Sequence, residues 1–176
     1  MLGYIVSSGA AGTGDRLIVA VAEALAARDV ALAGVIQVNV EHVPDRHCHM
    51  DLRLLGQGLS FRISEDRGRH ARGCRLDPRG LAEAVQQVET SLERQAPALL
   101  IVNKFGKEEA EGGGFREVIG KALSAGVPVL TSVSARNLPA FLAFAEGLAT
   151  KVPAELDAVV AWCLGEAGVT GRRRSA

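Results

Sequence analysis

The sequence has few aromatic residues, few cysteines and no excess of charge of either sign. Of its 176 residues, 4% are aromatic and three are cysteine, and 20 Lys and Arg balance 20 Asp and Glu. A formal net charge of zero gives no overall electrostatic attraction to nucleic acid, so no nucleic-acid partner is expected. No apolar run approaches the roughly 18 residues that a membrane-spanning helix needs. We therefore expect no membrane span.

The cysteines and the first residues indicate the compartment. Three cysteines are an odd number, and the opening MLGYIVSSG lacks a basic region followed by a long apolar run. Both features favour a cytoplasmic protein with reduced thiols. Because 48% of the residues are apolar, the chain can bury one sizeable core. We predict a single domain over residues 1–168 and a flexible basic tail over 169–176.

Short apolar runs alternate with amphipathic stretches along most of the chain. Buried strands are predicted at residues 2–8, 30–38, 97–105 and 127–133. Helices are predicted at residues 15–29, 80–95, 112–126, 137–149 and 154–168. Two short alternating runs around the turn at 56–58 predict a β-hairpin, and an arginine-rich connector over 65–80 is predicted to be a surface loop. The pattern predicts a three-layer α/β domain with a mainly parallel sheet and one inserted β-hairpin.

The loop after the first predicted strand has the spacing of a phosphate-binding loop without its lysine. Gly9 and Gly14 match the G-x-x-x-x-G of a Walker A motif, but Asp15 and Arg16 stand where Lys and Ser or Thr are required. A carboxylate there repels phosphate by about 1–4 kcal/mol per pair of unit charges. Backbone N–H groups can still converge on an anion. The candidate anion-binding residues of this loop are Gly9, Gly12, Thr13, Gly14 and Arg16.

Three interpretations of this loop remain open. It can be a plain strand-to-helix turn that Asp15 caps, an anion or nucleotide pocket, or a site that hydrolyses nucleoside triphosphates.

The strand predicted at 97–105 ends in an amide and a cation instead of the acid of a Walker B motif. Asn103 and Lys104 occupy its end. Ligands of open α/β sheets gather at the carboxyl ends of strands, so Asn103 is well placed for a site. Lys104 can supply the positive charge that the first loop lacks. Without the acid, magnesium must be held by other groups.

A second candidate site lies in the segment EHVPDRHCHMDL. If this segment is extended, His47, His49 and Asp51 share one face, and Cys48 lies on the other. Imidazoles and a carboxylate suit zinc or another borderline metal. The alternative is a solvated, histidine-rich start to a strand.

The arginine-rich connector offers cations for an oxyanion. The guanidinium groups of Arg67, Arg72 and Arg75 suit phosphate or a tetrahedral oxometalate. Cys74, between Gly73 and Arg75, has electropositive neighbours that favour its thiolate and make it a further candidate metal ligand. The alternative is an exposed loop whose charges pair internally.

Four stretches together resemble a known bacterial family. They are CHMDLRLL, RISEDRGRHARGCRLDPRGL, LLIVNKFGKEEAEGGGFR and VPVLTSVSARNLPAFLAFAEGLA. The combination resembles a family of unknown function that is often associated with molybdate uptake genes. That family is distantly similar to P-loop nucleoside triphosphatases of the thermophile type and to molybdopterin-guanine dinucleotide adaptor proteins. The resemblance extends from Leu2 to about Ala149.

The resemblance implies a P-loop-NTPase-like fold. Residues 103–108 would then form one wall of the site. The hairpin and the connector would contribute Cys48, Asp51, Arg67, Cys74, Arg75 and Asp77. Asp15 and Arg16 depart from the pattern of active members of this fold.

Three hypotheses follow for the function. The first is a P-loop-like protein of molybdenum-related metabolism with little or no hydrolysis, which binds ATP or GTP with magnesium, or an oxometalate such as molybdate or tungstate. The second is an active nucleoside triphosphatase or phosphotransferase with altered Walker A and B motifs. The third is a metal-binding or redox module built on Cys48, Cys74 and the histidines. The expected partners are a small anion or nucleotide, together with a second copy of the chain or a protein of the molybdenum pathway.

Overall fold

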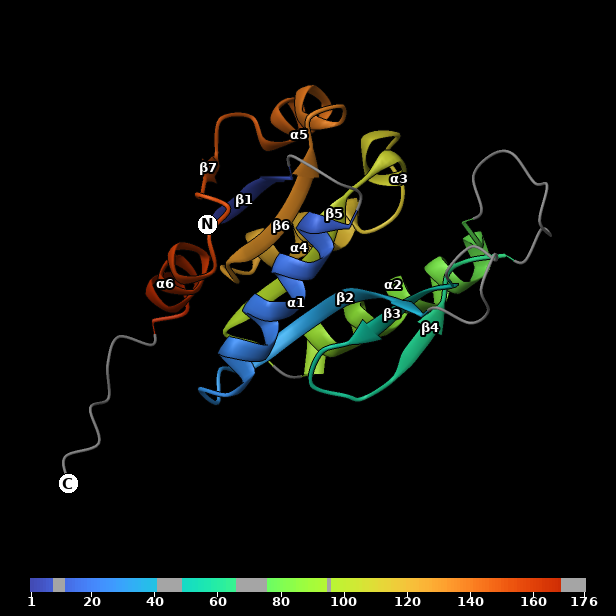
Figure 1. Cartoon of the computed structure of the whole chain (residues 1–176), viewed down its shortest axis with the longest axis horizontal. Coiled ribbons are helices and arrows are strands. Elements are labelled where there is room, and N and C mark those ends of the chain that lie inside the picture. Colours follow the sequence, from blue (N-terminus) through green and yellow to red (C-terminus); the bar gives the residue numbers. More distant parts are fainter. Residues whose placement is uncertain (8–11, 41–48, 66–75, 95, 169–176) are drawn as a thin grey trace.

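The computed structural model describes residues 1–7, 12–40, 49–65, 76–94 and 96–168, and within them seven strands form one sheet (Figure 1). The strand order is β4-β3-β2-β5-β6-β1-β7. The strands are β1 (Leu2–Ser7), β2 (Leu32–Val40), β3 (His49–Leu54), β4 (Ser60–Arg62), β5 (Leu99–Phe105), β6 (Val129–Ser134) and β7 (Ala149–Lys151). Neighbours from β2 to β7 pair in parallel, whereas β3 pairs antiparallel with both β2 and β4. The predicted mainly parallel sheet with one inserted β-hairpin is confirmed.

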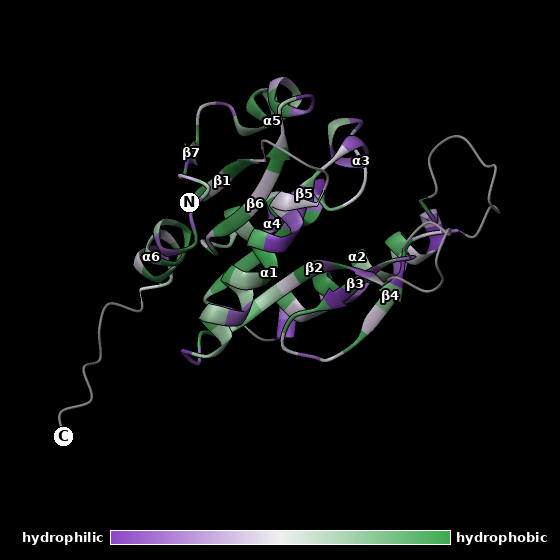
Figure 2. Cartoon of the chain, viewed as in Figure 1, coloured by the Kyte–Doolittle hydropathy of each residue, from purple (hydrophilic) through white to green (hydrophobic). Residues whose placement is uncertain are grey.

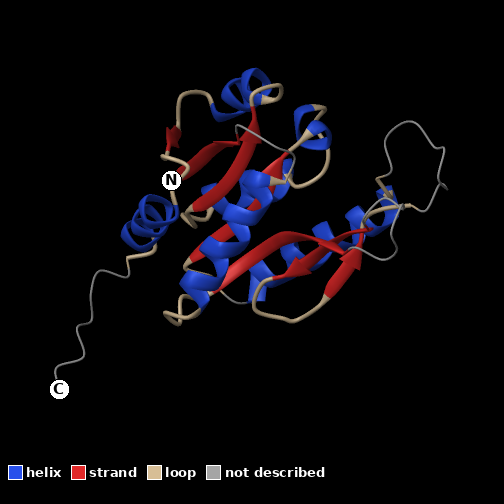
Figure 3. Cartoon of the chain, in the orientation of Figure 1, coloured by secondary structure: helices blue, strands red, loops and turns tan. Residues whose placement is uncertain are grey.

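Helices cover both faces of the sheet (Figure 3). They are α1 (Thr13–Ala26), α2 (Pro78–Arg94), α3 (Lys107–Ala110), α4 (Arg116–Ser124), α5 (Leu138–Ala145) and α6 (Leu156–Glu166). One buried cluster joins α1 and α6 to the sheet, and a second joins α2, α4 and α5 to its other face. The predicted three-layer α/β arrangement is therefore confirmed. Within the described ranges, none of the helices combines the length and the apolarity that crossing a membrane requires.

The central strand β5 shows why this sequence makes a buried parallel sheet. Its residues from Leu99 to Val102 are all buried, so the strand is a continuous apolar run, as is typical of strands covered on both faces (Figure 2). Leu99 and Ile101 pack with α1 and α6, whereas Leu100 and Val102 pack with α2, α4 and α5. The same alternation turns the next residue, Asn103, toward the face that carries α1.

The region after β5 differs from the prediction. The helix predicted at 112–126 begins only at Arg116, and the separate turn α3 precedes it. Gly112 and Gly114 have φ angles of 97° and 54°, which a continuous helix does not accommodate. The glycine run therefore separates two helices.

The segment after β6 also differs from the prediction. The helix predicted at 137–149 ends at Ala145, because Glu146 and Gly147 have positive φ angles of 48° and 83°. Residues 149–151 form the edge strand β7 instead. Three residues are too few to show an alternating pattern, so the sequence gives no signal for this strand. The predicted tail, 169–176, lies outside the described residues.

Gly34 allows β2 and β5 to approach closely at the centre of the sheet. It is paired with Ile101, has a φ angle of 107°, and an added Cβ would lie 1.9 Å from the Ile101 carbonyl oxygen. Both the space and the backbone conformation therefore require glycine.

We expect Gly34→Ala to lower the free energy of unfolding by about 3 kcal/mol or more, because backbone atoms must move to admit the methyl group. Urea unfolding followed by circular dichroism measures this change. The matched control is Gly120→Ala in the middle of α4, where an added Cβ meets no described heavy atom within 4 Å. The control should raise the free energy of unfolding by about 0.5–1 kcal/mol. A Gly34→Ala protein as stable as its parent would contradict the close approach.

Cys163 lies in α6 and is fully buried against the α1 face of the sheet. Burial raises the pKa of its thiol from 9.0 to about 12. The unfolded chain therefore loses this proton at a lower pH than the folded chain. We expect the free energy of unfolding to fall as pH rises from about 9 toward about 12, because deprotonation favours the unfolded state.

Alkylation by iodoacetamide checks the same burial. At mildly alkaline pH, mass spectrometry should find the peptide that contains Cys163 unmodified in native protein and modified in urea. Rapid modification of this peptide in the native protein would show that the thiol is accessible.

Candidate functional site

The carboxyl ends of β1 and β6 form the place where this sheet can hold a ligand. β1 leads into α1 on one face of the sheet, and β6 leads into α5 on the other. The last residues of the two strands, Ser7 and Ser134, are paired side by side. In open α/β sheets a crevice opens where neighbouring strands lead to opposite faces, and ligands bind there.

The start of α1 lies directly at this edge. The helix begins at Thr13, after Gly12 in a left-handed conformation with a φ angle of 84°, and no side chain among the described residues caps it. Gly14 permits tight packing onto the strand, because an added Cβ would lie 2.7 Å from the Cβ of Ser7. The first backbone N–H groups of a helix have no partner inside the helix, and those of α1 lie at this edge of the sheet. Gly9 lies outside the described residues.

Arg16 lies over the start of the same helix. Its Nη2 donates to the hydroxyl of Thr13 over 3.4 Å, and its Nη1 would lie 3.7 Å from a Cβ at Gly12. The side chain is exposed. A cation at the positive end of a helix is unfavourable by itself. An anion bound between the Arg16 guanidinium group and the helix N-terminus would be attracted by both groups. Of the predicted anion-binding residues, the structure brings Gly12, Thr13, Gly14 and Arg16 together.

The two residues that replace the Walker lysine and the Walker acid contact each other. Asn103 Nδ2 donates to Asp15 Oδ1 over 2.7 Å, across 88 positions of sequence. Asn103 is 2% exposed, and its other amide atom, Oδ1, accepts from the backbone N–H of Gln37 over 3.0 Å. Ser132 Oγ donates to the carbonyl oxygen of Asn103 over 2.7 Å. Asn103 thus connects α1, β2 and β6, and it turns the Asp15 carboxylate onto the edge of the sheet.

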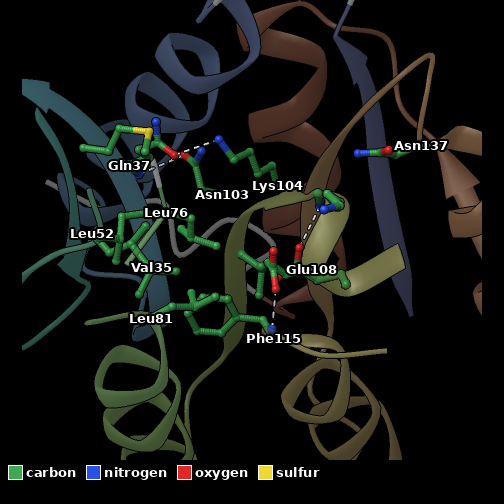
Figure 4. A pocket seen from close by; sticks show the side chains of 16 residues that line it. Val35, Gln37, Leu52, Leu76, Leu81, Asn103, Lys104, Glu108, Phe115 and Asn137 are labelled. Carbon is green, nitrogen blue, oxygen red and sulfur yellow. Dashed lines mark hydrogen bonds between the residues drawn. The ribbon is translucent and has the colours of Figure 1, made fainter. Parts of the chain in front are cut away.

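Lys104 contacts β2 and not the start of α1 in the described part of the chain. Its Nζ donates to Gln37 Oε1 over 2.8 Å (Figure 4). Gln37 Nε2 in turn donates to Asn39 Oδ1 over 2.9 Å. The register of β5 shifts between Val102 and Phe105, and the bond to Gln37 holds the Lys104 ammonium group beside β2 and away from Asp15. The ammonium group therefore lies next to β2, on the side of the sheet that α2 covers.

The candidate metal site is only partly described. His49 and Asp51 lie on β3, and Asp51 accepts two hydrogen bonds from Arg62 of β4, over 2.7 and 3.3 Å. The pairing raises the pKa of Arg62 and links the two strands of the hairpin. Among the described residues, no group of three His, Cys, Asp or Glu side chains is arranged to hold a metal. The predicted residues outside the described ranges are His47, Cys48, Arg67, Arg72, Cys74 and Arg75, so their roles stay predictions.

Glu109 organises the loop after β5, and sequence reasoning missed it. Its side chain is 5% exposed, Oε2 accepts from the backbone N–H of Gly106 over 2.8 Å, and Oε1 accepts from that of Phe115 over 3.0 Å. The first of these bonds is half of a capping box at α3. A glutamate three residues after a glycine at the end of a strand is the signal that could have identified it.

A cavity of about 380 Å³ opens beside this loop on the α2 side of the sheet (Figure 4). Its walls come from β2, β3, β5 and α2, and the loop held by Glu109 closes one side. Lys104 and Gln37 stand at its rim. The resemblance implied that residues 103–108 form one wall of a site beside the hairpin, and Asn103, Lys104, Gly106, Lys107 and Glu108 of that range line this cavity. The apolar interior between the sheet and α2 was not predicted.

Comparison with known proteins gives a family and one curated relative. The chain is 31% identical over 148 residues to the "Molybdenum import ATP-binding protein ModC 2" of Bradyrhizobium diazoefficiens. That match covers 84% of the chain but only 16% of the relative's length. No solved structure matches the chain. The model of a family described as "Protein of unknown function (DUF2478)" matches residues 3–162, and the chain therefore belongs to the DUF2478 family.

Proposed function

We propose that this chain binds a small anion at the start of α1, as part of molybdenum-related metabolism and with little or no hydrolysis. The anion is the phosphate of a nucleotide such as ATP or GTP, or an oxometalate such as molybdate or tungstate. The observation that carries the proposal is the hydrogen bond from Asn103 to Asp15, which holds the carboxylate against the end of β5, at a helix that begins after Gly12 and has no side-chain cap among the described residues. The name of the curated relative supports the link to molybdenum and to ATP.

The charges around the helix start favour one small, compact anion. Asp15 and Arg16 carry opposite unit charges, and the N-terminus of a helix adds about half a positive charge. The sum is slightly positive, with the backbone N–H groups of the first turn as donors. A weak positive field and several donors suit a tetrahedral oxyanion better than a triphosphate, which brings several negative charges close to Asp15.

Hydrolysis needs groups that this site lacks. In P-loop enzymes a lysine neutralises the β- and γ-phosphates, a hydroxyl and an acid hold magnesium, and catalysis is mostly positioning and charge stabilisation. Here Asp15, Arg16 and Asn103 occupy these three positions. The charge at the lysine position is reversed and the acid is an amide, so both the phosphates and the magnesium ion lose their partners.

Thermal melting with molybdate, tungstate, phosphate, ATP and GTP, each with and without magnesium, tests the anion site. We expect at least one anion to raise Tm by about 5–10 °C at about 100 times its Kd, without a requirement for magnesium. Arg16→Ala should reduce this shift. The matched control is Arg28→Ala, which removes the same charge near the other end of α1, where Arg28 bonds the carbonyl of Ala24. Equal shifts in both variants, or no shift with any anion, would contradict the proposal.

Introducing the Walker residues tests the proposed reason for little or no hydrolysis of nucleoside triphosphates. We expect the triple variant Asp15→Lys, Arg16→Thr and Asn103→Asp to gain magnesium-dependent binding of ATP or GTP, because a lysine, a hydroxyl and an acid return to one edge of the sheet. Calorimetry with and without magnesium measures the gain, and phosphate release measures turnover in both proteins. Magnesium-dependent phosphate release by the unmodified protein would favour the active nucleoside triphosphatase instead.

A further inference from the structure

The cavity on the α2 side has the size and depth of a small-molecule site. Its volume of about 380 Å³ falls in the range of about 300–1,000 Å³ that is usual for such sites. Val35, Leu52 and Val102 of the sheet line the cavity together with Leu81 of α2 and Phe115. Val35, Leu52, Leu81 and Phe115 can be followed in Figure 4. A molecule seated here would contact hydrocarbon on both sides. The body of the ligand must therefore be apolar.

The polar groups of the cavity stand at its rim, at the carboxyl ends of β2 and β5. The rim offers donors in the Lys104 ammonium and the Asn137 amide, and acceptors in the Glu108 carboxylate and the Gln37 amide. Asn137 precedes α5, and its side chain does not cap that helix. Gln37 is 5% exposed and is held by Lys104 and Asn39, so its amide has a fixed orientation. The ligand must therefore carry both donors and acceptors along one edge.

Among the described residues that line the cavity, the charges cancel. Lys104 and Lys107 supply two positive charges, and Glu108 and Glu109 supply two negative charges. The Glu109 carboxylate is already used by backbone N–H groups. A balanced rim gives no net attraction for an anion, in contrast to the start of α1. The part of the ligand inside the cavity is therefore uncharged.

We propose that this cavity binds an uncharged fused heteroaromatic ring whose donor and acceptor atoms lie along one edge, the chemistry of a purine base. An alkyl chain would leave the donors and acceptors of the rim without partners, at a cost in affinity. A flat ring can insert between the sheet and Leu81 while its edge meets Lys104 and Glu108. Asn103, which bonds Asp15 of the proposed anion site, also lines this cavity, but the apolar walls and the rim that carry this proposal are other residues.

Isothermal titration calorimetry with guanosine and adenosine tests the proposal, because nucleosides carry the ring without a phosphate. We expect saturable binding of at least one of them. Leu81→Trp should weaken it about tenfold or more by filling the cavity. The matched control is Val85→Trp, one turn further along α2 and outside this cavity, which should keep the affinity. If Leu81→Trp fails to fold, Lys104→Met, at an exposed position, should weaken binding by removing a donor.

Three results would overturn the proposal. They are the absence of binding with both nucleosides, an unchanged affinity in a folded Leu81→Trp or Lys104→Met protein, and saturable binding of n-octanol without binding of either nucleoside. The result of this nucleoside titration can be distinguished from the result of the thermal-melting test of the anion site. Molybdate or phosphate can fail to shift Tm while a nucleoside binds, and the reverse result is equally distinguishable.

Discussion

The candidate site depends on one buried side-chain amide, that of Asn103. Its two polar atoms join the first turn of α1 to the backbone of β2, and its carbonyl oxygen accepts from Ser132 of β6. A buried amide without these partners would cost about 1–3 kcal/mol for each polar group left unsatisfied. The position of α1 on the carboxyl edge of the sheet, and hence the direction of its N-terminus, is tied to this residue.

Two neighbouring polar side chains at the end of β5 contact different elements. Asn103 is directed to α1 and to a slightly positive helix start, whereas Lys104 is directed to β2 and to the rim of an apolar cavity. Glu109 then fixes the loop that follows, so the cavity has a rigid side. Adjacent residues of one strand thus contact different elements, Asn103 the first turn of α1 and Lys104 the β2 side chain Gln37, and both line the cavity.

Much of the fold was accessible from sequence, because buried parallel strands are continuous apolar runs and the hairpin has glycines at its turn. The bond between Asn103 and Asp15 could not be predicted from sequence. It joins positions 88 apart, and predicting it requires the strand order. The same holds for the direction of Lys104. β7 was missed because three residues show no period. The cavity depends on how α2 lies across the sheet, which no local pattern specifies.

The two departures from the Walker pattern form a single feature. If Asp15 had replaced the lysine while an acid remained at position 103, two carboxylates would lie within hydrogen-bond distance and repel by about 1–4 kcal/mol at effective dielectrics between water and a protein surface. An amide at Asn103 turns that repulsion into a hydrogen bond of 2.7 Å and keeps α1 in place. The amide at position 103 therefore removes the repulsion that Asp15 would otherwise meet there. The pair holds the first turn of α1 on the sheet, and in the proposed function it takes the place of the charges on which triphosphate chemistry depends.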